Sequence, residues 1–149
     1  MYKKLIAWPL LALALLPAAW AEQEFLKPDR AFAISATATD GRSVRFNWQI
    51  ADGYYLYRNK LAFESATDGI VFSAAQLPQG LPHEDEFFGK QQVYRDRFFV
   101  TIPYTVSGER PETFPLIIKS QGCDDNIGLC YPPQTWTETV TLTSTIAEK

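Results

Sequence analysis

Hydrophobic and polar side chains alternate along much of this chain. Apolar residues occupy every second position from 43 to 50 and again from 97 to 106. A period of two places successive side chains on opposite faces of a β-strand, so both segments are predicted to be strands with one buried face. The side chains expected to point inward are Val44, Phe46, Trp48, Ile50, Phe98, Val100, Ile102 and Tyr104.

Shorter segments of the same character follow between turn signals. Asp-Gly pairs occur at positions 40–41, 52–53 and 68–69, and this pair is typical of tight turns between antiparallel strands. No segment keeps a helical period over three turns. Residues 76–92 are rich in proline, glycine and acidic side chains and are predicted to be irregular. The further strands expected are 31–39, 54–57, 61–63, 70–72, 114–119 and 135–143.

Many short strands separated by turns indicate an all-β domain, either a sandwich or a barrel. We favour an immunoglobulin-like antiparallel β-sandwich. The two cysteines, Cys123 and Cys130, do not correspond to the inter-sheet bridge of antibody domains. That bridge joins strands far apart in sequence, whereas one loop separates these two residues.

The first residues have the pattern of an export signal. Lys3 and Lys4 precede an apolar run from 5 to 16, Pro17 ends it, and residues 19–21 have the small-x-small pattern of a cleavage site. The run is short for a membrane span. We therefore expect a signal peptide at 1–21 and one exported domain at 22–149; an uncleaved anchor is the competing interpretation.

Charge narrows the range of partners. The chain has 14 Lys+Arg and 17 Asp+Glu, a net charge of −3. Loss of the two lysines with residues 1–21 would leave 12 − 17, or −5. An acidic domain without a basic stripe does not favour nucleic acid or anionic lipid as a partner. Ten Phe, seven Tyr and four Trp provide enough apolar area for a core that needs no disulfide staple.

The segment from 120 to 133 contains both cysteines, with six residues between them. Asp, Asn and Gly in that interval favour a turn, so the segment is predicted to be a strand, a tight loop and a return strand. Two cysteines in an exported chain normally pair. The pair fits either a structural staple, worth about 2–3 kcal/mol for so small a ring, or a working dithiol open to exchange. Copper binding is disfavoured because one His and one Met offer too few further ligands.

Several motifs in fixed order resemble the N-terminal periplasmic domain of the DsbD thiol:disulfide interchange protein family. They are WQIADGYYLYR at 48–58, LPQG at 77–80, HEDEFFGK at 83–90, YRDR at 94–97, QGC at 121–123 and GLCYPP at 128–133. The resemblance extends from about 32 to 142. This chain has one residue more between its cysteines than the family pattern.

The resemblance implies an immunoglobulin-like sandwich with a cap loop over an active-site hairpin. It implies a protein-disulfide reductase that takes electrons from a membrane domain and a thioredoxin-like domain. The expected acceptors are oxidised periplasmic thioredoxin-fold proteins, namely disulfide isomerases and the cytochrome c maturation thioredoxin. Cys130 would form the mixed disulfide and Cys123 would resolve it. No metal or organic cofactor is implied.

The same resemblance assigns a cap and an active-site environment. Phe87 would shield the sulfurs, and Gly89 would act as a hinge. Carboxylates of the cap would disfavour the thiolate form of the cysteines. Alternatives remain open: Phe87 as core, Glu86 as a solvated acidic side chain, and the tyrosines as strand packing. The residues so assigned are Tyr55, Tyr57, Asp85, Glu86, Phe87, Phe88 and Gly89.

Two points complete the sequence-based expectations. His83, the lone histidine, is given a surface position and no catalytic role. The competing function is a non-catalytic sandwich that binds proteins and carries a structural disulfide.

Overall fold

The structure, a computed structural model, describes residues 25–142. The signal peptide expected at 1–21 lies outside the described residues. The described part contains twelve strands, which pair antiparallel, and two short helical turns. The elements are α1 Pro28–Ala31, β1 Phe32–Thr39, β2 Ser43–Ile50, β3 Tyr54–Tyr57, η1 Arg58–Lys60, β4 Ala62–Ser65, β5 Ile70–Phe72, β6 Leu81–Asp85, β7 Gly89–Tyr94, β8 Arg97–Val106, β9 Thr113–Ser120, β10 Gly122–Asp124, β11 Leu129–Cys130 and β12 Gln134–Thr141.

Two sheets enclose the hydrophobic core. One has the strand order β1-β2-β8-β5 and the other β12-β9-β4. The inward side chains of both belong to one buried cluster, as expected when two sheets pack face to face. The alternation in the sequence therefore reports a real buried face, and the all-β sandwich is confirmed. Central members of the cluster are Val44, Phe46, Trp48, Val100, Ile102, Phe114, Leu116 and Ile118.

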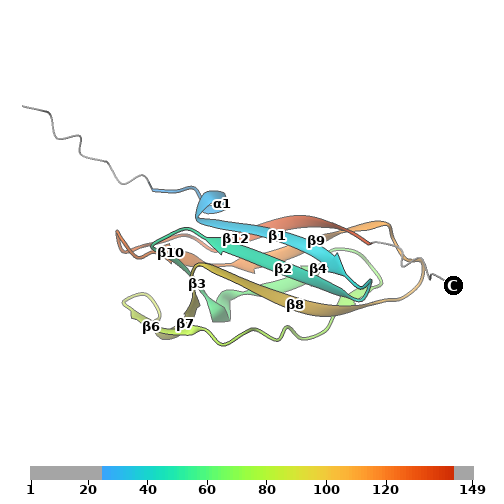
Figure 1. The fold of residues 1–149 in the computed structure, drawn as a ribbon, viewed down its shortest axis with the longest axis horizontal. Helices are drawn as coiled ribbons and strands as arrows, with labels where there is room; N and C mark the ends of the chain where they lie inside the picture. Colours follow the sequence, from blue (N-terminus) through green and yellow to red (C-terminus); the bar gives the residue numbers. More distant parts are fainter. Residues whose placement is uncertain (1–24, 143–149) are drawn as a thin grey trace, which may run out of the picture.

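A third sheet lies at one end of the sandwich and contains both cysteines. Its order is β11-β10-β3-β7-β6, and these strands gather at one end of the molecule in Figure 1. Strand β3 follows β2 through the turn at 51–53, so the sandwich positions the centre of this sheet. The short β10–β11 pair lies on one side of β3, and the β6–β7 hairpin lies on the other.

One sequence expectation about the fold is wrong. Residues 76–92 were expected to be irregular, but β6 and most of β7 form a hairpin there. Strand β6 is at the edge of the sheet and pairs only with β7. Edge strands tolerate proline and charged side chains, such as Pro82 and Glu84, because one side of the backbone needs no partner. Polar composition therefore concealed the hairpin. Strand β4 also begins and ends slightly later than expected.

Between residues 25 and 142, no helix is long and apolar enough to cross a membrane.

Candidate active site

The two cysteines form a disulfide between adjacent strands. Cys123 in β10 and Cys130 in β11 lie directly opposite each other, with Cα atoms 3.9 Å apart. Cys123 is buried, 1% exposed, whereas Cys130 is half-buried. A working dithiol was expected to be open to exchange, and burial shows that this is wrong for Cys123. The reason is that β10 is an inner strand, held between β11 and β3.

The turn between the cysteines is held to the rest of the domain. The Asp124 carboxylate accepts a hydrogen bond from the Asn126 backbone N–H at 2.9 Å. The backbone N–H of Asp125 donates to the Gly53 carbonyl at 2.9 Å. The Asp125 carboxylate pairs with the Arg95 guanidinium at 2.7 Å. One bond within the turn and two bonds to other parts of the domain thus hold the cysteine-bearing turn in place.

Two tyrosines form a floor beneath the sulfurs. Tyr55 and Tyr57 are two residues apart in β3, so both phenols project from the same face of the strand, and Tyr55 lies opposite Cys123 in the sheet. Both side chains are buried. The hydroxyl oxygen of Tyr57 lies 3.2 Å from Cys123 Sγ and 3.7 Å from Cys130 Sγ.

Asp85, at the end of β6, accepts four hydrogen bonds. Its Oδ2 accepts from the Tyr57 hydroxyl at 2.6 Å and from the Tyr55 hydroxyl at 3.1 Å. Its Oδ1 accepts from the backbone N–H groups of Phe87 at 2.9 Å and Phe88 at 2.8 Å. Burial alone would raise the pKa of Asp85, but these hydrogen bonds outweigh it and hold the pKa below its usual value. The carboxylate is therefore ionised at neutral pH.

The phenols stay protonated beside that charge. Burial raises the pKa of Tyr55 to about 12, with the charge of Asp85 acting in the same direction. Burial, followed by the hydrogen bond to Asp85, raises the pKa of Tyr57 well above its ordinary value. A phenol has one proton to donate, and the 2.6 Å contact assigns that of Tyr57 to Asp85. The Tyr57 oxygen therefore turns lone pairs toward the sulfurs. It can accept a hydrogen bond from a thiol, but it cannot donate one to a thiolate.

The cap hairpin, defined here as residues 81–94, covers this floor. The Phe88 ring packs edge-on against the Tyr57 ring with centroids 4.9 Å apart, and the Lys60 ammonium lies 4.6 Å from the Phe88 ring centroid. Phe87 is more exposed, at 47%, and Glu86 is also exposed. Phe88 is thus the cap aromatic that contacts the tyrosine floor. Gly89 adopts φ +66°, a left-handed conformation that favours glycine in the turn.

His83 is in a different place from the one expected. It was assigned to the surface, but its ring lies 4.4 Å from the Tyr55 ring and its side chain is only 16% exposed. Its Nε2 is 3.5 Å from Asp85 Oδ2. The signal that would have located it is its position two residues before Asp85, because that spacing puts both side chains on one face of a strand. The signal was missed because the segment was treated as irregular.

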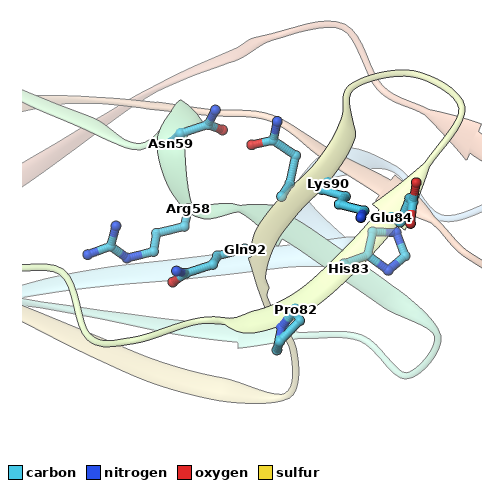
Figure 2. A pocket seen from close by; sticks show the side chains of 8 residues that line it. Arg58, Asn59, Pro82, His83, Glu84, Lys90 and Gln92 are labelled. Carbon is cyan, nitrogen blue, oxygen red and sulfur yellow. The ribbon is translucent and has the colours of Figure 1, made fainter.

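The cap hairpin also borders a surface pocket of about 690 Å³, and His83 is among the residues that line it. Figure 2 shows Pro82 and Glu84 from β6, Lys90 and Gln92 from β7, and Arg58 from η1 around it. Most of the lining residues are polar or charged, and neither cysteine is among them. Within the part of the chain that the structure describes, no group of three His, Cys, Asp or Glu side chains could hold a metal ion.

Comparisons with known proteins agree on one family. The family model described as "Thiol:disulfide interchange protein DsbD, N-terminal" matches residues 22–142. The DsbD protein of Escherichia coli K12 is 40% identical over 124 residues, which cover 83% of this chain and 20% of that protein. DsbD 2 of Pseudomonas aeruginosa is 41% identical over 113 residues, which cover 76% of this chain and 18% of that protein. The chain thus spans about a fifth of the length of these curated relatives.

Solved structures give the same result. The reduced DsbD N-terminal domain of Neisseria meningitidis aligns with a TM-score of 0.64 and 30% identity, covering 78% of this chain and 89% of that one. The same Neisseria domain in a complex with the PilB N-terminal domain aligns with a TM-score of 0.60 and 28% identity, covering 76% and 85%. With a disulfide at the position that the sequence motifs indicated, the chain belongs to the family of DsbD N-terminal thiol:disulfide interchange domains.

Proposed function

We propose that this chain is a periplasmic protein-disulfide reductase domain that passes electrons through Cys123 and Cys130. The observation that carries the proposal is the asymmetry of the pair. Cys130 is half-buried at the edge of the sheet, whereas Cys123 is buried in the strand next to it. A visiting protein can therefore reach Cys130 but not Cys123. Exchange needs one attacking sulfur and one resolving sulfur, and this asymmetry supports those two roles.

The reaction begins with the dithiol form of the domain. The Cys130 thiolate attacks one sulfur of the acceptor's disulfide, that bond breaks, and the acceptor's other sulfur leaves as a thiolate. Cys123 then loses its proton and attacks Cys130 Sγ, which forms the Cys123–Cys130 bond and releases the second acceptor thiolate. Two electrons move to the acceptor, whose thiolates take up the protons that the domain's thiols released.

Exposed apolar side chains around the pair support docking of a protein rather than a small thiol. Phe87 and Phe88 lie at the turn of the cap hairpin, Ile127 lies in the turn between the cysteines, and Leu129 begins β11. All four are exposed, between 38% and 47%. Apolar groups left in solvent beside a reactive group are typical of an interaction site. The Neisseria domain forms a complex with the PilB N-terminal domain, which supports a protein as the acceptor here.

We infer that the acceptors are oxidised periplasmic thioredoxin-fold proteins, namely disulfide isomerases and the cytochrome c maturation thioredoxin. The donor is the thioredoxin-like domain of the same family, supplied through a membrane domain. The relatives are about five times longer than the matched region, which is consistent with such further domains. The signal-like residues 1–21 support export to the periplasm.

The competing proposal is a protein-binding sandwich with an inert disulfide. The apolar rim fits either function. The accessible Cys130, the buried Cys123 and the phenol beside both sulfurs are needed only for exchange. The reduction potential of the Cys123–Cys130 disulfide distinguishes the two proposals. A structural disulfide has a far more negative potential than a thioredoxin-fold partner, whereas a disulfide that relays electrons has a potential close to that of its partner.

The test is transfer from the reduced chain to an oxidised disulfide isomerase, followed by gel shift and mass spectrometry. Cys130→Ser should form no mixed disulfide. Cys123→Ser should accumulate one, because the resolving sulfur is gone. A matched control is the isomerase with its cysteines alkylated, which should give no adduct with either variant.

Two results would count against the proposal. If the reduced wild-type chain transfers no electrons to the isomerase or to the cytochrome c maturation thioredoxin, the inert disulfide is the better account. If Cys130→Ser forms the adduct and Cys123→Ser does not, exchange stands but the roles of the two sulfurs are reversed.

A further inference from the structure

His83 has a buried nitrogen without a hydrogen bond. Its Nε2 is shielded from solvent and makes no hydrogen bond, yet Asp85 Oδ2 lies 3.5 Å away. The imidazole ring rests on Tyr55, which limits how far it can move. A buried polar atom without a partner is costly and calls for an explanation. Here a charged oxygen lies just beyond bonding distance of that atom.

That oxygen already has two donors. Asp85 Oδ2 accepts from Tyr57 at 2.6 Å and from Tyr55 at 3.1 Å. An imidazolium N–H would be a third donor with a positive charge, and charge-assisted bonds are roughly twice as strong as neutral ones. Protonated His83 would therefore compete with Tyr57 for the same oxygen.

Other ionisable groups surround His83, and their charges are mixed. Arg95 lies 5.0 Å from the Tyr55 ring and is itself paired with Asp125. Glu84 and Lys90 lie opposite each other in the cap hairpin, and with Arg58 they line the pocket that His83 borders. Figure 2 shows His83 and Glu84 side by side on β6, with Lys90 on the neighbouring strand. The titratable or charged groups to consider from every element near His83 are Tyr55, Tyr57, Arg58, Glu84, Asp85, Lys90, Arg95 and Asp125.

We propose that His83 is a positioning residue for the exchange reaction: its protonation draws Asp85 Oδ2 away from Tyr57 and frees the Tyr57 hydroxyl to donate to a cysteine sulfur. With neutral His83, Tyr57 gives its proton to Asp85 and only accepts from a thiol. With charged His83, Tyr57 can turn its proton toward the thiolate of Cys130, and the added positive charge acts in the same direction. The inference rests on the proposed exchange function and adds to it a control by pH.

The expected consequence is that the thiolate form of Cys130 remains populated at lower pH than it would without His83. For a simple thiol, the rate of alkylation falls about tenfold for each pH unit below its pKa, because only the thiolate reacts. Imidazole groups change charge between about pH 5 and pH 8. Over that interval, under this proposal, the alkylation rate of Cys130 should fall less steeply with decreasing pH.

The experiment is alkylation of Cys130 by iodoacetamide in the reduced chain from about pH 5 to pH 8.5, with mass spectrometry to locate the adduct. Wild type should show a bend in the plot of log rate against pH. His83→Gln should give a straight line. The ratio of wild-type to variant rates should be about 3- to 10-fold larger near pH 5.5 than near pH 8, which corresponds to one hydrogen bond.

Lys90→Gln is the matched control, because it removes a cation from the outer face of the same hairpin; it should keep the bend. A straight line for wild type overturns the proposal without any variant. So does a bend that persists in His83→Gln or disappears in Lys90→Gln. Alkylation needs no protein partner, so failure of transfer to a thioredoxin-fold acceptor would refute the proposed function but would leave this result standing.

Discussion

Tyr57→Phe is the substitution that best isolates one atom of the site. It removes the hydroxyl group, whose oxygen contacts both sulfurs and whose O–H donates to Asp85 at 2.6 Å, while the buried ring remains. A hydrogen bond to a charged acceptor contributes about 1.5–3 kcal/mol. The free energy of unfolding should fall by about that amount in urea titrations of the oxidised chain.

The same change should alter the thiols of the reduced chain. The Tyr57 oxygen can accept a hydrogen bond from S–H but has no free proton for a thiolate, so it stabilises the protonated form. Loss of one such bond, about 0.5–1.5 kcal/mol, corresponds to a rise of about 2- to 12-fold in the alkylation rate of Cys130 at pH 7.

Tyr55→Phe is the matched control for both measurements. Tyr55 is equally buried and also donates to Asp85, at 3.1 Å, but within residues 25–142 its hydroxyl has no hydrogen bond to either sulfur and contacts the Tyr57 hydroxyl instead. Because the bond to the same carboxylate is longer, this variant should lose stability at the lower end of the range for a charged acceptor, about 1.5 kcal/mol, and leave the alkylation rate within about twofold. Equal acceleration by both variants would mean that a loosened cap, rather than the Tyr57 oxygen, controls the thiol. An unchanged rate in Tyr57→Phe would refute the reasoning outright.

Three further predictions concern the cap, the backbone and alkaline pH. Phe87→Ala should leave the unfolding free energy within about 0.5 kcal/mol and speed reaction with small oxidants, whereas Phe88→Ala should also destabilise the fold; identical rates for Phe87→Ala and wild type would remove the shielding role. Gly122→Ala should cost about 1–3 kcal/mol in urea titrations, because a Cβ there would collide with the Tyr55 carbonyl and approach Phe32 Cζ to 2.6 Å, and an unchanged midpoint would contradict this. The pKa of Tyr55 is raised from 10.0 to about 12 mainly by burial, so its stabilising contribution should be complete below pH 10 and lost as the pH rises toward 12; urea titrations of wild type and Tyr55→Phe over that interval should converge.

Period-two alternation predicted the strands that border the core. Strands β2 and β8 have the bounds expected from the sequence, because each has one face buried in the sandwich and apolar side chains at every second position. The cysteine segment was also predicted as strand, turn and strand, since turn-forming residues occupy the interval between the cysteines. Where a strand is buried on one face only, alternation of apolar and polar residues reveals it.

Alternation carried no information on the cap hairpin. Strand β6 is at a sheet edge, so Pro82 and charged side chains are tolerated there and no apolar period develops. Because β6 was not predicted, the position of His83 on the same strand face as Asp85 was not predicted either. Phe87 and Phe88 are adjacent in sequence, and only the turn geometry decides that Phe88 packs on Tyr57.

The chain alone specified an all-β domain, the likeness to an exchange family and the identity of the two sulfurs, because these depend on residue types and on spacings along one strand or one loop. Burial of Cys123, partial exposure of Cys130 and the contacts of the Tyr57 hydroxyl with both sulfurs and with Asp85 depend on which strands become neighbours. Strands β3, β6 and β10 are far apart in sequence, and hydrogen bonding across the third sheet brings them together. Proton positions and access in the site are therefore properties of the tertiary structure.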